Sequence, residues 1–146
     1  MLYPIENQFR TLKNLDGFWD FSADTKNIGL NENWQIELGG DIRQLGVPAS
    51  WNEQINDLYN FHGKGWYEKI TFVPKEWIDK SVYLRFGSVA GKATVFINGE
   101  KAFSHIGTAL PFEAEISSLL DIVTPSIESF TKSRQLSPDI SRLATA

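Results

Sequence analysis

Apolar and polar residues alternate in several short segments of the chain. Between residues 15 and 23 an apolar or small residue occupies every second position, and the same period of two runs through residues 81–86, 93–97 and 112–116. Successive side chains of a β-strand point to opposite faces of a sheet, so this period is typical of strands with one face in a core. These four segments are therefore predicted to be half-buried strands.

Turn-forming residues separate the predicted strands, and helical periodicity is almost absent. Asn98-Gly99 lies between two apolar-containing runs, and both residue types tolerate the positive φ angles of a tight hairpin turn. Single helical turns are predicted only at residues 74–78 and 116–120. Many short strands joined by Gly, Asn and Pro turns predict an all-β sandwich.

Residues 121–146 differ in composition from the rest of the chain. They contain eight Ser or Thr and two Pro, but no Gly, Trp or Tyr, and they show no period of two. This pattern predicts no further strand of the same sheet. A disordered or weakly helical tail is one interpretation, since Ile127, Phe130 and Arg134 share one face of a helix.

Composition excludes several classes of function. A chain of 146 residues is about one domain, and its charge of −4 with no adjacent Lys or Arg residues excludes a phosphate-binding surface for nucleic acid. Without cysteine the chain has no disulfide, thiolate metal site or cysteine nucleophile. The two histidines, His62 and His105, lack metal-ligand spacing. We therefore expect neither a metal nor a cofactor.

The amino-terminal residues carry no targeting signal. They lack a basic segment followed by an apolar run of signal-peptide length, and no stretch approaches the ~20 apolar residues that span a bilayer. We therefore expect a cytoplasmic protein without a membrane partner.

Five motifs occur in a fixed order along the first 120 residues. They read Leu15-Asp16-Gly17-Phe18-Trp19, Val47-Pro48-Ala49-Ser50-Trp51-Asn52, Gly65-Trp66-Tyr67 running to Phe72-Val73-Pro74, Ala93-Thr94-Val95-Phe96-Ile97-Asn98-Gly99-Glu100, and Pro111-Phe112-Glu113-Ala114-Glu115-Ile116. In this order and spacing they resemble the amino-terminal sugar-binding domain of glycoside hydrolase family 2, especially that of the β-glucuronidases. The resemblance covers about residues 1–120.

The resemblance implies a fold and a role. It implies a jelly-roll β-sandwich of the galactose-binding type, belonging to a parent enzyme of carbohydrate metabolism that hydrolyses β-glucuronides or β-galactosides by a retaining mechanism. In the family both catalytic glutamates lie on a separate barrel domain, which is the partner of this domain. The 146-residue chain alone is therefore expected to be inactive, with no catalytic residue of its own.

Glu113 and Glu115 are the only closely spaced pair of carboxylates on a predicted strand. A retaining glycosidase needs two carboxyl groups about 5–5.5 Å apart on either side of the scissile bond. These two alternate with an apolar row and lie on one face, about 6.6 Å apart along the strand. A solvated face is the better interpretation.

The loop of residues 52–65 is the best candidate for sugar contact, because it combines amides, carboxylates and aromatic rings. Its candidate contacts, together with the first residues of the following strand, are Asn52, Asn56, Asp57, Tyr59, Asn60 and Trp66. In related β-galactosidases the corresponding loop reaches the active site with an Asn, and Asn60 is the nearest counterpart by position. The alternative is that these polar residues cap turns, and that Trp66 packs in the core.

The tail departs from the family pattern, in which strands of alternating Val and Leu complete the sandwich. Residues 121–146 are therefore expected to be foreign to the family, and the sandwich to lack its last strands. Three functions remain open: a non-catalytic accessory domain of a family 2 glycosidase, a free-standing carbohydrate-binding module, or a non-functional remnant whose open strand edges aggregate.

Overall fold

A computed structural model describes residues 4–77, 79–107, 110–120 and 140–145. Short strands account for most of the regular structure in these residues, and the helices are single turns. The strands are β1 (Gly17–Asp24), β2 (Arg43–Val47), β3 (Lys64–Phe72), β4 (Tyr83–Phe86), β5 (Lys92–Ile97), β6 (Glu100–Ile106), β7 (Phe112–Glu115) and β8 (Ile140–Thr145). The helical turns are α1 (Trp51–Gln54) and the 3-10 turns η1 (Asn56–Leu58), η2 (Lys75–Trp77) and η3 (Ser117–Leu119).

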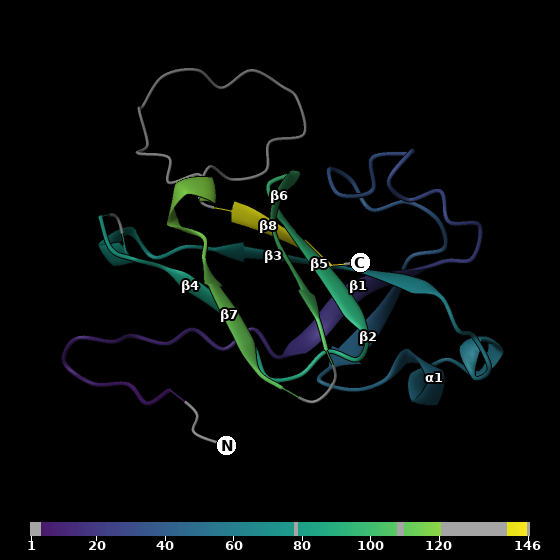
Figure 1. The fold of residues 1–146 in the computed structure, drawn as a ribbon, viewed down its shortest axis with the longest axis horizontal. Coiled ribbons are helices and arrows are strands. Elements are labelled where there is room, and N and C mark those ends of the chain that lie inside the picture. Colours follow the sequence, from purple (N-terminus) through teal and green to yellow (C-terminus); the bar gives the residue numbers. More distant parts are fainter. Residues whose placement is uncertain (1–3, 78, 108–109, 121–139, 146) are drawn as a thin grey trace.

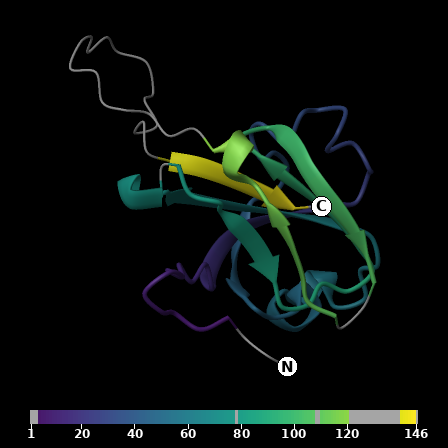
Figure 2. The same ribbon diagram turned by 60° about the vertical axis from the view of Figure 1, so that its left-hand side comes forward.

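The strands form two sheets. The larger sheet has the order β2-β1-β3-β8-β5-β6, and the smaller one pairs β4 with β7. Each of these neighbouring pairs is antiparallel. Figures 1 and 2 show the β4–β7 pair lying across one face of the larger sheet, with β8 in yellow between β3 and β5.

The four strands predicted from alternation are confirmed within one or two residues as β1, β4, β5 and β7. The hairpin turn is confirmed as well, because Asn98 and Gly99 have φ angles of 51° and 84° and join β5 to β6. The two expected helical turns are η2 and η3. Local pattern and turn chemistry therefore located half of the described strands and half of the described helical turns.

β8 corrects the prediction of no strand after residue 120. Residues 140–145 pair with β3 from Tyr67↔Thr145 to Phe72↔Ile140, and with β5 from Val95↔Thr145 to Ile97↔Leu143. A strand with neighbours on both sides gains its stability from pairing and burial, which its own sequence pattern does not report. The helix face proposed for Ile127, Phe130 and Arg134 lies outside the described residues. Whether residues 121–146 are foreign to the family stays a prediction.

The main core lies between the two sheets. Its buried members come from β1, β4 and β5 and from the segments flanking β4 and β7: Trp19, Val82, Leu84, Val95, Ile97 and Ile116. The smaller sheet covers only part of the larger one. Beside it, a second apolar cluster of Phe21, Leu45 and Ile55 is covered by the segment around α1. Two sheets that pack on a common apolar core form a β-sandwich.

The opposite face of the larger sheet is partly covered by the β1–β2 loop, residues 25–42. Trp34 and Leu38 of this loop pack on Trp66 of β3 and Phe96 of β5, and all four are buried. The loop is fixed at its start by Asp24, which is 5% exposed. Asp24 Oδ1 accepts from the Ile28 N–H at 2.8 Å, and Oδ2 accepts from the Gly29 N–H at 2.9 Å and from Trp66 Nε1 at 3.3 Å.

We predict that Asp24→Asn destabilises the protein most at neutral pH. Burial alone would raise the pKa of Asp24, but the hydrogen bonds from Gly29, Ile28 and Trp66, with the charge of Lys64, hold it below its ordinary value of 3.8. Because the folded-state pKa is depressed, this carboxylate stabilises the fold above pH 3.8 and loses its effect as the pH falls through the lower value. The expected loss at pH 7 is about 1–3 kcal/mol.

Urea unfolding at pH 7 and pH 3 checks this prediction. The difference between the wild type and Asp24→Asn should shrink at pH 3, and Asp16→Asn, at an exposed carboxylate, is the matched control. A difference of equal size at both pH values would contradict the role of the charge.

Candidate functional site

Asn52 anchors the candidate loop from inside. The side chain of Ser50 caps α1 by accepting from the Asn52 N–H, and it also donates to Asn52 Oδ1 at 3.3 Å. Asn52 Nδ2 donates to the carbonyl oxygens of Leu58, Tyr59 and Phe61 at 2.7, 3.0 and 3.1 Å. An amide group has two N–H donors, so three carbonyls use all of its donor capacity. Asn52 therefore stabilises the loop.

Gln54, on the same short helix, ties the loop to the outer strand β2. Its Oε1 accepts from the Gly46 N–H at 2.7 Å, and its Nε2 donates to the Gly46 carbonyl at 3.0 Å. The carboxamide thus makes the pair of hydrogen bonds that a neighbouring strand would make. Figure 1 shows α1 beside β2.

An ion pair fixes the next turn of the loop. Arg43 on β2 donates from Nη1 and Nη2 to the two carboxylate oxygens of Asp57 at 2.7 and 2.8 Å, and its Nε and Nη2 also bond Asp41. The hydrogen bonds from Arg43 lower the pKa of Asp57, and those from Asp57 and Asp41 raise the pKa of Arg43. The guanidinium is thus engaged by two carboxylates.

Apolar side chains hold the underside of the loop. Ile55 is buried in the cluster with Phe21 and Leu45, and Trp51 stacks on Phe21 with ring centroids 5.6 Å apart. The ring of Phe61 is tilted against Trp51, with ring centroids 6.3 Å apart. The loop is therefore part of the core on one side.

The other side of the loop is open to solvent. Tyr59 is 69% exposed, and Asn56 and Asn60 are exposed beside it in sequence. Together they offer one aromatic ring, one hydroxyl and two amides. Such groups can stack on a sugar ring and exchange hydrogen bonds with its hydroxyls.

Trp66 does not belong to this exposed surface. It is 1% exposed, with its ring centroid 5.8 Å from Phe96 and 6.2 Å from Trp34. A sugar contact by Trp66 would require opening the core, so the packing interpretation replaces it. Of the six candidate residues, Asn56, Tyr59 and Asn60 are thus accessible, and Asn52 is engaged within the loop. Asp57 is exposed but paired with Arg43 of β2.

Sequence reasoning missed Arg43 and Gln54. Arg43 meets Asp57 fourteen positions away, and Gln54 meets Gly46 eight positions away, across a change from strand to helix. Neither spacing belongs to a regular element, so no local pattern indicated these contacts.

The other polar groups considered do not form a reaction centre. Glu113 pairs with Arg85 at 3.0 Å, and Glu115 accepts from the Ser117 hydroxyl; both glutamates are exposed. Within the described ranges, His, Asp and Glu side chains nowhere gather in a group that could hold a metal ion. Among the same residues, no helix is both long and apolar enough to cross a membrane.

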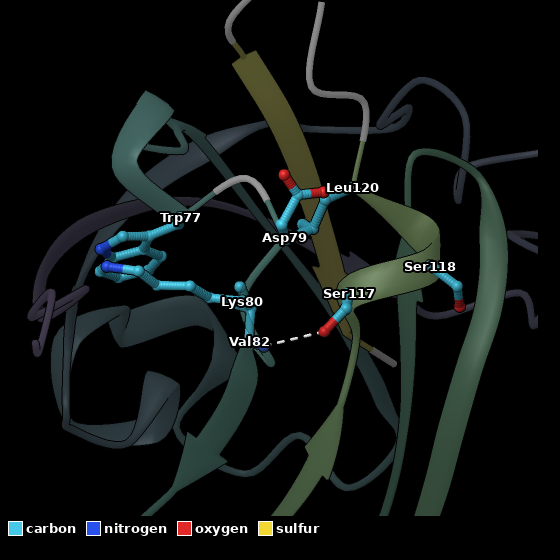
Figure 3. A pocket seen from close by; sticks show the side chains of 7 residues that line it. All are labelled: Trp77, Asp79, Lys80, Val82, Ser117, Ser118 and Leu120. Carbon is cyan, nitrogen blue, oxygen red and sulfur yellow. Dashed lines mark hydrogen bonds between the residues drawn. The ribbon is translucent and has the colours of Figure 1, made fainter. Parts of the chain in front are cut away.

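An open pocket of about 420 Å³ lies between η2 and η3 (Figure 3). Trp77, Asp79, Lys80, Val82, Ser117, Ser118 and Leu120 line it. The Ser117 hydroxyl accepts from the Val82 N–H at 2.8 Å and donates to Glu115, so it is already engaged. This pocket includes none of the candidate loop residues.

Comparisons of the sequence with a family model and with individual proteins point to the same family. The family model described as glycosyl hydrolases family 2, sugar binding domain, matches residues 12–124. The β-glucuronidase of Paenibacillus borealis is 39% identical over 119 residues, and that of Homo sapiens 38% over 133 residues. These matches cover 80% and 84% of this chain, which spans about 20% of the length of either relative.

Comparison of the fold with solved structures points to the same family as the sequence. A solved β-glucuronidase from Ruminococcus gnavus has a TM-score of 0.81 and 31% identity, covering 99% of this chain and 22% of that one. The family assignment and the observed sheets confirm the expected jelly-roll sandwich. The chain belongs to glycosyl hydrolases family 2, through the sugar-binding domain of that family.

Proposed function

We propose that the chain is the non-catalytic accessory domain of a β-glucuronidase-type glycosidase, and that its 52–65 loop contributes contacts at the rim of the glycoside site. In this proposal a catalytic barrel domain is its partner and supplies both glutamates. The family match over residues 12–124 carries the proposal. The relatives named above are β-glucuronidases, and one solved relative holds D-glucuronic acid.

The geometry of the loop supports a rim contact. Its base is fixed by Asn52, Gln54 and Arg43, while Tyr59 and Asn60 stay exposed. Asn60 is also the residue that the resemblance to β-galactosidases singles out. A cytoplasmic location and the lack of a nucleic-acid, membrane or cofactor partner stay predictions from the sequence.

We expect no hydrolysis of p-nitrophenyl β-D-glucuronide by the purified 146-residue chain. Retaining hydrolysis needs two carboxyl groups on either side of the bond. The described strand pair, Glu113 and Glu115, is engaged by Arg85 and Ser117. The chromogenic assay should give the background rate at every protein concentration. Turnover that scales with protein, and is lost in Glu113→Gln or Glu115→Gln, would overturn the accessory role.

A free-standing carbohydrate-binding module is the second candidate, favoured by the exposed ring of Tyr59. Calorimetry against glucuronate, galactose and oligosaccharides separates the two candidates. A saturable isotherm indicates a module. An isotherm that does not saturate indicates an accessory domain, whose few rim contacts bind a sugar only weakly without the barrel. A sharp, cooperative thermal transition would argue against a non-functional remnant.

A further inference from the structure

The candidate loop has a fixed base and a free tip. In the part of the chain that the structure describes, the side chains of Tyr59 and Asn60 have no hydrogen-bond partner, whereas the carbonyls of residues 58, 59 and 61 bind Asn52 Nδ2. Asp57, two residues before Tyr59, is bound by two nitrogens of Arg43. The backbone of the tip is thus held while its side chains face solvent.

We propose that Asn52 and Arg43 are positioning residues for a preformed contact tip, Tyr59 and Asn60, and that this tip recognises sugar hydroxyls rather than a carboxylate. This inference rests on the proposed rim contact and deepens it, because it divides the candidate residues by role. It also assigns the sugar hydroxyls as the groups of a glycoside that the loop binds.

The tip offers the chemistry of hydroxyl recognition. The phenol of Tyr59 and the amide of Asn60 each donate and accept hydrogen bonds, as a sugar hydroxyl does, and neither carries a charge. Their exposure leaves both groups available. A uronate carboxylate, in contrast, is best bound by a guanidinium with free parallel N–H groups.

Arg43 is the guanidinium that contacts this loop, and both of its pairs of parallel N–H groups are engaged. Asp57 takes Nη1 and Nη2, while Asp41 takes Nε and Nη2. A uronate would have to displace Asp57 and thereby release the loop. Arg43 is therefore assigned to loop geometry, and recognition of the carboxylate is assigned to another part of the parent enzyme.

A fixed backbone suits a contact made at the edge of a site. Ordering a flexible loop on binding reduces affinity, so a loop that is ordered beforehand loses less. The three carbonyls on Asn52 and the two oxygens on Arg43 order the tip before any ligand arrives.

Hydrogen exchange of the chain tests the positioning role. The N–H groups of Leu58, Tyr59 and Phe61 bond to loop carbonyls. Asn52→Asp keeps the shape but replaces the donor by an acceptor, so their exchange should accelerate about tenfold or more. Asn56→Asp adds the same charge at an exposed site of the same loop and should change little. Arg43→Lys, a milder change, should give an intermediate acceleration, and unchanged exchange in both Asn52→Asp and Arg43→Lys would overturn positioning.

Nuclear magnetic resonance titration with methyl β-D-glucuronide and methyl β-D-glucoside tests whether the tip recognises sugar hydroxyls or the carboxylate. Tyr59 and Asn60 signals should shift similarly with both sugars. Asn52→Asp should reduce both responses alike, and Arg43→Lys should leave their ratio unchanged. A response to glucuronide alone that Arg43→Lys removes would overturn the assignment of Arg43.

The sugar contact and the positioning role can be contradicted separately. If neither sugar shifts the tip while Asn52→Asp still accelerates exchange, the sugar contact is overturned and the positioning stands. If the sugars shift the tip but exchange is unaffected, the rim contact stands and the positioning is overturned.

Discussion

A chain that ends at Asp139 will lose the cooperative fold. β8 is the only link between β3 and β5 in the described sheet order, so without it the larger sheet separates into β2-β1-β3 and β5-β6. Six residue pairs with β3 and three with β5 disappear together. The expected loss is about 5 kcal/mol or more, which is comparable to the whole stability of a small domain.

Circular dichroism on heating and size-exclusion chromatography measure this effect. The truncated chain should show no sharp transition and should aggregate, because two newly exposed edges can pair with other chains. A chain lacking residues 1–5 is the control, since Pro4 and Ile5 lie outside every described strand. A truncated chain that melts like the full one would show that β8 does not join the sheet.

Trp66→Ala should be the most destabilising single substitution considered. The side chain is 1% exposed, stacks on Phe96, meets Trp34 edge to face, and donates to Asp24 at 3.3 Å. Removing a buried indole costs about 3–5 kcal/mol, because it leaves a cavity and removes the transfer energy of the ring. For a chain of this size the melting temperature should fall by about 10–20 °C.

Calorimetric melting of three variants tests this expectation. Trp66→Phe keeps a ring on Phe96 but loses the bond to Asp24, so it should lie between the wild type and Trp66→Ala. Tyr59→Ala, at a 69% exposed ring, should change stability by no more than about 0.5 kcal/mol. A small effect of Trp66→Ala would return this residue to the candidate contacts.

Local signals predicted four of the eight described strands and the tight turn between β5 and β6, and contacts between distant segments account for the missed strand β8. The period of two located β1, β4, β5 and β7, because apolar or small residues alternate with other residues in each of them. β8 has polar and apolar residues without this order, and its place is determined by the free edges of β3 and β5. A sequence pattern reports which face is buried and does not report edge pairing.

The sequence identified residues 52–65 as a polar segment before a strand, but the roles of its residues were not predictable. Asn52 and Asn60 are the same residue type eight positions apart, yet one is bonded to three carbonyls and the other is exposed. The difference arises from how the chain turns back after η1. Trp66 belongs to one of the family motifs, but the motif did not indicate that its side chain is buried.

The bond between Gln54 and Gly46 has a consequence for solubility. β2 is one outer strand of the larger sheet, and such strands invite pairing with another chain. The Gln54 carboxamide already occupies the N–H and carbonyl of Gly46, the last residue but one of β2, so an incoming strand cannot pair there without displacing it. Self-association by strand addition is therefore expected at the opposite outer strand, β6, where Ile106 is 78% exposed.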